Sequence, residues 1–137
     1  MFPRKQTDWI VVTATMTDER LPAREIEWRG RKYGYLDAGC HFIIENEITT
    51  VVRPRHMVGV GVRPHNDRSV VITLSGKPPF TASQLEMLGA TVDGMLGYYP
   101  TARVVAHSAL PGSRSDAPGF DVDAWFVGHK AAKAVSE

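Results

Sequence analysis

The sequence predicts a single α/β domain in which a central mixed β-sheet is flanked by α-helices. Two observations predict this fold class. Short runs rich in β-branched and apolar residues, typical of buried strands, recur along the chain at 8–15, 40–45, 48–52, 69–75 and 104–106. Segments with a helical spacing of apolar residues lie between and after these runs. Strands that alternate with helices are typical of folds in which helices cover the faces of a sheet.

The length and composition limit the possible classes of protein. The 137 residues suit one domain, 1–137, with a core over about 7–135. A net charge of +1 gives no strong field toward nucleic acid or membrane, so we expect neither as a direct partner. Cys40 is the only cysteine, so no intrachain disulfide can form, which suits a reducing cytoplasm. No apolar run reaches the roughly 20 residues of a membrane span, and the polar first seven residues are too short for a secretion signal.

The first strand and the first helix follow directly from local patterns. Residues 8–15, DWIVVTAT, predict a central strand that is apolar on both faces and has Thr13 near its end. Pro22 suits the first turn of a helix over 23–32, and Gly34 suits its end.

The next two strands predict an antiparallel pair. A strand over 40–45, CHFIIE, is followed after a turn of two residues by a strand over 48–52. Because side chains alternate along a strand, we expect Cys40 and Phe42 on one face and His41 on the other.

The second half of the chain supplies the remaining elements. Residues 69–75 predict another buried strand. Thr81 and Gln84 form the pattern of a capping box, and the helix that follows has one apolar face, made of Leu85, Leu88, Val92 and Leu96. A short strand at 104–106 and a closing helix over 121–135 complete the fold.

The loop over 53–68 is a candidate binding segment because it concentrates cations. A loop of this kind on a rigid scaffold binds an anionic ligand or is a solvated connector, and the sequence leaves both open. Its candidate binding residues are Arg53, Arg55, Arg63 and His65.

A second candidate site surrounds the last strand. His107 stands where this strand ends, and the Ser-, Pro- and Gly-rich loop that follows carries Arg114 and Asp116. Such a set is typical of a metal or catalytic site, or of a capped loop in which Arg114 pairs with Asp116. Thr13 and Cys40 also lie near strand ends, so the three could share one crevice with His107.

Several segments, in the same order, resemble zinc-dependent N-acetylmuramoyl-L-alanine amidases, most closely the small amidases that short-tailed phages use as lysozymes. Peptidoglycan recognition proteins share this fold. The resemblance covers about residues 7–126, and its most specific segment is YLDAGCHFII, in which the family has tyrosine before the histidine. The segments are TDWIVV, AREIEW, YLDAGCHFII, FTASQLEML and VVAHSALPGSRSDAPGFDVDAWF.

The resemblance implies a zinc ion with three protein ligands and an open water position. By position, the first zinc histidine falls on Thr13, the second on His107, and the third ligand, Cys or Asp in the family, on Asp116. The family tyrosine falls on Cys40, and the family lysine falls on Arg114. One ligand and the tyrosine are therefore replaced, so we expect no cofactor, with zinc at low occupancy or through Cys40 as the alternative.

The resemblance leaves three functions open. The first is a catalytically degenerate pseudoenzyme that acts as a binding or regulatory protein, with a phage-type RNA polymerase as candidate partner. The second is an active amidase with an altered ligand set, in which Cys40, His107 and Asp116 hold zinc. The third is a binder of peptidoglycan or of a small ligand in the former groove. Cys40 could also be a nucleophile with His107 as base, or a small apolar residue that fills the space of the tyrosine. A phage-encoded protein of this kind would act in the cytoplasm of the infected host.

Overall fold

A five-stranded mixed sheet forms the centre of the protein in the computed structural model, which describes residues 2–136. The strand order is β3-β2-β4-β1-β5. Four strands are mutually parallel and the edge strand β3 is antiparallel to β2, which confirms the predicted α/β class. The strands are β1 (Trp9–Ala14), β2 (Phe42–Ile44), β3 (Thr49–Val51), β4 (Ser69–Leu74) and β5 (Arg103–Ala106).

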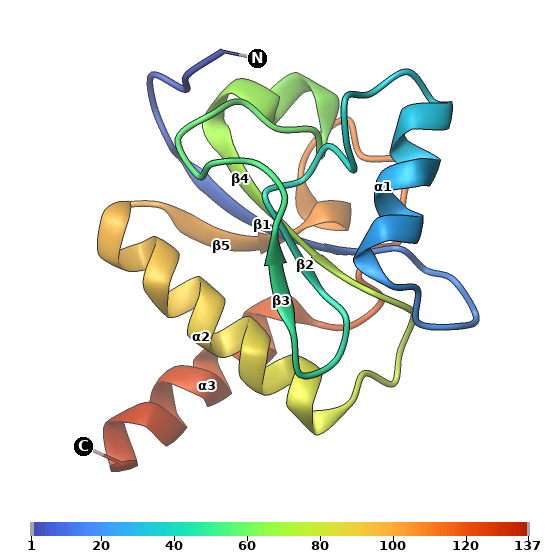
Figure 1. Ribbon diagram of the computed structural model, residues 1–137. Coiled ribbons are helices and arrows are strands. Elements are labelled where there is room, and N and C mark those ends of the chain that lie inside the picture. Colours follow the sequence, from blue (N-terminus) through green and yellow to red (C-terminus); the bar gives the residue numbers. More distant parts are fainter. Residues whose placement is uncertain (1, 137) are drawn as a thin grey trace.

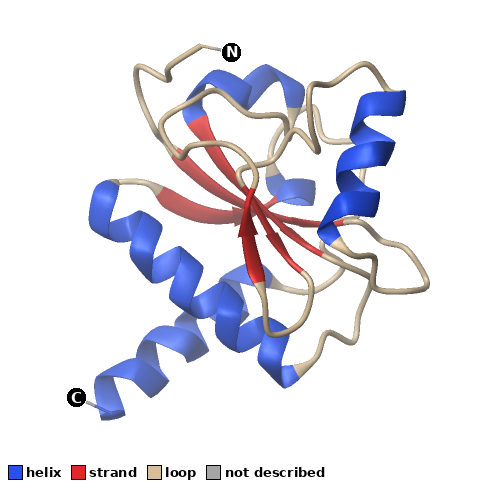
Figure 2. Cartoon of the chain, in the orientation of Figure 1, coloured by secondary structure: helices blue, strands red, loops and turns tan. Residues whose placement is uncertain are grey.

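Helices cover both faces of this sheet (Figures 1 and 2). Helix α1 (Ala23–Lys32) lies on one face, and α2 (Ala82–Tyr98) and α3 (Val122–Ser136) lie on the other. Two 3₁₀ helices, η1 (Arg63–Arg68) and η2 (His107–Ala109), precede β4 and follow β5. Among residues 2–136, no helix combines the length and apolar character that a membrane crossing requires.

The core divides into two layers because side chains alternate along the strands. Ile10 and Val12 of β1 pack with Leu88 and Val92 of α2. Val11, between them in the sequence, points the other way and packs in the cluster beneath α1. The sheet places β1 between two other strands and covers it on both faces. This burial on both sides explains why apolar residues follow one another along β1.

Helix α1 lies unusually close to the chain that leads into β2. A Cβ at Gly30 would collide with the backbone carbonyl of Asp37. Gly30 lowers the helix propensity, but it allows the helix to pack here.

The capping box predicted at the start of α2 is present. The Thr81 hydroxyl accepts from the backbone N–H of Gln84 at 3.0 Å, and the Gln84 side chain accepts from the Thr81 N–H at 3.1 Å. The Gln84 amide also donates to the buried Ser75 carbonyl at 2.8 Å, so the cap fixes the helix to the end of β4.

Two expectations need correction. Cys40 and Phe42 were expected on one face, but Cys40 packs in the α1-side cluster and Phe42 in the opposite one. Strand β2 begins only at Phe42, and the positive φ of Gly39 marks non-strand backbone before it, so the alternation does not reach back to Cys40. The segment 53–68 also contains the 3₁₀ helix η1 and is not a continuous loop.

Candidate functional site

The parallel register brings two candidate residues together at the carboxyl edge of the sheet. The β1–β5 register ends at Val12 and Ala106, and Thr13 and His107 are the residues that directly follow this last pair. On its other side Thr13 pairs with Thr73 of β4. Sequence reasoning named Thr13 and His107 as candidates for one crevice, and it missed Thr73.

The imidazole of His107 already has protein partners. Its Nδ1 lies 2.7 Å from Oγ of Ser113, which belongs to the following loop. A backbone hydrogen bond with Gly61 engages the ring as well. Burial lowers the pKa of His107, and this backbone bond only partly opposes the shift, so the ring is neutral at pH 7. Sequence reasoning missed Ser113 because the separation of six residues along an irregular loop does not predict the contact.

Cys40 lies inside the same face of the sheet. Its side chain is 3% exposed, and its thiol has a hydrogen bond with the Thr73 side chain. Burial is the largest effect and raises the pKa of the thiol to about 11, while the Thr73 bond acts in the opposite direction. Cys40, Thr73, Thr13 and His107 thus form a row of neutral polar groups, which we call the strand-end row.

Arg114 and Asp116 extend from the loop after η2 and are exposed. This loop returns to the sheet through its backbone: the Ser108 N–H donates to the Ala117 carbonyl at 3.0 Å. In the described part of the chain, Arg114 and Asp116 form no ion pair with each other.

The donor set of the strand-end row does not fit a zinc ion. Thr13 offers only a neutral hydroxyl, which is a poor zinc ligand, and Cys40 is buried with its thiol hydrogen-bonded to Thr73. Within residues 2–136, no group of three or more His, Cys, Asp or Glu side chains is arranged to hold a metal ion.

The cations proposed from the segment 53–68 do not converge on one ligand. Arg53 is buried, donates to both carboxylate oxygens of Asp37 at 2.9 and 3.2 Å, and also donates to the Val58 carbonyl. Its charge is therefore neutralised inside the protein.

The other three candidate residues lie at separate positions. The Arg55 guanidinium lies 3.5 Å from the ring centroid of Tyr98 on α2. His65 donates from Nε2 to the Pro111 carbonyl at 2.9 Å, and Arg63 is exposed at the start of η1.

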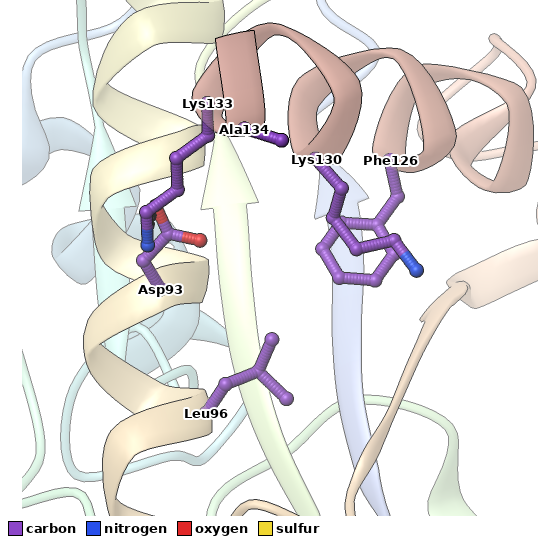
Figure 3. A pocket seen from close by; sticks show the side chains of 6 residues that line it. All are labelled: Asp93, Leu96, Phe126, Lys130, Lys133 and Ala134. Carbon is purple, nitrogen blue, oxygen red and sulfur yellow. Dashed lines mark ion pairs between the residues drawn. The ribbon is translucent and has the colours of Figure 1, made fainter. Parts of the chain in front are cut away.

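A hollow between α2 and α3 lies on the opposite face of the sheet (Figure 3). Lys133 of α3 points toward Asp93 of α2, and their charged groups are 3.6 Å apart. His129 also bonds Asp93 at 3.1 Å and stacks on Trp125 with ring centroids 5.3 Å apart. These contacts hold α3 against α2, so we interpret this hollow as part of the helix packing.

Comparison with known proteins identifies the protein family of this chain. A family profile described as "N-acetylmuramoyl-L-alanine amidase" matches residues 3–120. This span is most of the chain, and the chain belongs to that family.

The relatives narrow the class to endolysin-like members. The chain is 30% identical over 133 residues to the endolysin of Enterobacteria phage K11, covering 89% of this chain and 87% of that protein. It is 29% identical over 134 residues to the endolysin of Escherichia phage T7, covering 90% and 87%.

Solved structures agree with this fold. An N-acetylmuramoyl-L-alanine amidase from Clostridium intestinale superposes with a TM-score of 0.79 at 22% identity, covering 94% of this chain and 86% of that one. Peptidoglycan recognition protein LE, in complex with tracheal cytotoxin, superposes with a TM-score of 0.73 at 16% identity, covering 85% and 77%.

Proposed function

We propose that this chain is an amidase-family protein that has lost zinc-dependent hydrolysis and acts by binding peptidoglycan. The main support for this proposal comes from Thr13 and His107, which follow the last β1–β5 pair. Position 13 offers a hydroxyl, and the His107 imidazole is already hydrogen-bonded to Ser113 and Gly61. A zinc site that activates water needs three good ligands and an open fourth position. The row offers no such set.

The chemistry of the row suits recognition better than hydrolysis. The Thr13 hydroxyl and the neutral His107 imidazole are the partly exposed groups of the row, and such groups exchange hydrogen bonds with amides and sugar hydroxyls. Peptidoglycan presents both groups. One structural neighbour, peptidoglycan recognition protein LE, is described in complex with monomeric diaminopimelic acid-type peptidoglycan, which supports this choice of partner.

The first experiment measures metal content and activity together. Protein purified without chelator should contain well under one zinc per chain, should release no peptide from muropeptides, and should sediment with purified sacculi. One zinc per chain together with peptide release would contradict the proposal.

A restoration experiment tests whether only the site has changed. The double variant Thr13→His with Cys40→Tyr returns the family residues to both positions, so it should gain stoichiometric zinc. The Cys40→Tyr single variant is the matched control and should remain without metal, because it adds no imidazole.

An active amidase with an altered ligand set is the competing function. It needs Cys40, His107 and Asp116 around one ion, and among residues 2–136 no such group of side chains is arranged to hold a metal. If zinc is found, Cys40→Ser should remove it under this alternative and leave it unchanged if Cys40 is not a ligand.

The regulatory role that the resemblance implies stays a prediction. A phage-type RNA polymerase as partner would be detected by affinity capture from phage-infected cells. Binding to sacculi and binding to a polymerase are separate measurements, so one result does not decide the other.

A further inference from the structure

The amino edge of the sheet, at the opposite end from the strand-end row, is rich in cations. Strands β1, β4 and β5 all begin at this edge, where Trp9 pairs with both Ser69 and Arg103. Figure 1 shows the N-terminal segment and η1, which precede β1 and β4, at this same end. Asp8 and Asp67 are the carboxylates beside these cations. The cations are Arg4, Lys5, Arg55, Arg68 and Arg103.

The net charge of +1 conceals this concentration because the other edge of the sheet has the opposite sign. The loops that leave the four parallel strands carry Arg20, Lys77 and Arg114 as their cations. The same loops carry twice as many carboxylates: Asp18, Glu19, Glu45, Glu47, Asp116 and Asp121. A small net charge is therefore compatible with a local site for a polyanion.

Most of the positive charge at the amino edge is not neutralised within the protein. The Arg68 guanidinium lies 3.4 Å from a carboxylate oxygen of Asp8, and 56% of the Arg68 side chain is accessible. Among residues 2–136, the other four cations of this edge form no ion pair: Arg4, Lys5, Arg55 and Arg103. An anion can thus approach them without displacing an internal partner.

Aromatic rings hold two of these guanidinium groups in place. The guanidinium carbon of Arg55 lies 3.5 Å from the ring centroid of Tyr98, and that of Arg4 lies 5.2 Å from the ring centroid of Tyr99. The two tyrosine rings are neighbours, with centroids 6.3 Å apart. A ring behind a guanidinium fixes the position of its plane and leaves its charge in place.

The cations form one continuous surface. Arg4, Lys5 and Arg68 line a hollow of about 380 Å³. The backbone of Asp8 connects Arg68 to Arg103, because its N–H donates to the Arg68 carbonyl and its carbonyl accepts from the Arg103 N–H, both at 2.8 Å. The surface therefore runs from Arg103 through the hollow to the two tyrosine rings, and we call it the basic edge.

We propose that the basic edge binds the phosphate backbone of a single-stranded nucleic acid. Four of its five cations are arginines, whose planar guanidinium groups bind phosphate through two parallel hydrogen bonds. A row of unpaired cations matches the repeated charge of a phosphodiester chain, and such binding does not depend on base sequence. Unpaired bases also stack on guanidinium planes and on exposed rings such as Tyr98, which is 58% exposed.

This inference does not depend on the proposed function, because the basic edge and the strand-end row lie at opposite ends of the sheet. An anionic bilayer fits the basic edge less well. An interfacial surface presents a broad apolar face to the acyl region, whereas the hollow is lined mainly by charged and polar side chains. An acidic protein offers carboxylates but no bases that stack on the guanidinium planes.

The test measures the fluorescence anisotropy of a labelled oligothymidylate of about 20 nucleotides as the full chain is added. Binding should have a Kd of about 1 to 100 μM at physiological salt and should tighten as salt is lowered to about 50 mM. For three or four neutralised phosphates, the logarithm of the association constant should fall with the logarithm of salt concentration with a slope of about −2 to −3.

A double variant removes two cations of the basic edge. Arg55→Gln with Arg103→Gln should weaken binding at about 50 mM salt at least about tenfold and make the slope shallower by about 1.4. Lys5→Gln removes one exposed charge with little risk to the fold, and it should make the slope shallower by about 0.7. Arg20→Gln with Arg24→Gln is the matched control, since it removes two exposed arginines near the other edge; its affinity should stay within about twofold.

Four results would overturn the inference. One is no rise in anisotropy at about 50 mM salt, and another is equal weakening by the control variant and by the folded basic-edge variants. The third is displacement of the oligothymidylate by polyglutamate as effectively, per charge, as by unlabelled oligothymidylate, which would indicate an acidic protein partner. The fourth is binding to phosphatidylglycerol vesicles without binding to the oligothymidylate. None of these results changes the zinc content or the binding to sacculi, so the proposed function is decided separately.

Discussion

Thr13 and His107 show how one substitution changes the chemistry of neighbouring residues. Positions 13 and 107 directly follow Val12 and Ala106, the last pair of the β1–β5 register. With threonine at position 13, His107 is held by Ser113 and Gly61 and stays neutral. At the residue scale, the site is a hydrogen-bonding surface.

Buried His41 makes the stability of the fold depend on pH. It is fully buried, donates from Nε2 to the Met57 carbonyl, and accepts at Nδ1 from the Val71 N–H. Burial lowers its pKa from 6.5 to about 4. The unfolded chain therefore takes up a proton at a higher pH than the folded chain. The contribution of His41 to stability is therefore fully present above pH 6.5 and is lost as the pH drops toward 4, by about 3 kcal/mol.

Urea denaturation at a series of pH values checks this prediction. His41→Gln keeps a donor and an acceptor without a titrating group, so its stability should change much less between pH 6.5 and 4. The lowered pKa of His107 changes stability with pH in the same direction. The variant His107→Gln measures how much of the pH dependence comes from His107. Equal slopes for the original protein and His41→Gln would show that His41 is not responsible.

Cys40 should be chemically inert in the folded protein. A rise in pKa from 9.0 to about 11 lowers the thiolate fraction about 100-fold at neutral pH, and burial blocks access further. At pH 8, DTNB should label the native protein at least about 100-fold more slowly than the protein in guanidinium. Fast stoichiometric labelling of the native protein would mean that Cys40 is an accessible, activated thiol.

At the scale of elements, the loops decide the site more than the helices and strands do. Strands β1, β4 and β5 bring Thr13, Thr73 and His107 to one edge. The loop after η2 then adds Ser113 to His107, and the segment before β2 places Cys40 against Thr73. Neither loop has a periodicity that reveals these contacts in advance.

The capping box of α2 should contribute measurably to stability. Thr81 accepts from the Gln84 N–H and donates to Asn46 Oδ1 at 2.7 Å, so Thr81→Ala removes two bonds. We expect a loss of about 1 to 2 kcal/mol in the free energy of unfolding, measured by urea titration. Thr91→Ala removes a hydroxyl that donates to the Met87 carbonyl within the helix; it is the control and should lose less than about 0.5 kcal/mol. Equal losses would indicate that the cap contributes nothing specific.

At the scale of the whole molecule, the two apolar layers on either side of the sheet account for the fold without a metal. The largest fully buried side chains, such as Ile10, Ile43, Ile72 and Leu88, come from the central strands and α2. The structure therefore has a core of its own, of the kind that a domain of this length can build.

The thermal stability should not depend on zinc. A ligand that binds only the folded state at 100 times its Kd stabilises it by about 2.7 kcal/mol. Since the strand-end row lacks a ligand set, neither EDTA nor added zinc should shift the midpoint of thermal unfolding measured by circular dichroism. The Thr13→His, Cys40→Tyr variant is the comparison and should show a zinc-dependent rise. A rise of several degrees in the original protein would reveal a metal site.

The sequence by itself determined the α/β class, the alternation of elements and the capping box at Thr81, and its resemblance to the amidase family implied which residues stand at the family's ligand positions. These depend on local periodicity and on residue identity at fixed positions. Only the tertiary structure decided that Ser113 engages His107, that Cys40 faces the α1 side with Thr73, and that Arg53 is neutralised by Asp37. The physical reason is that these contacts join irregular segments far apart along the chain, where neither strand nor helix periodicity fixes the direction of a side chain.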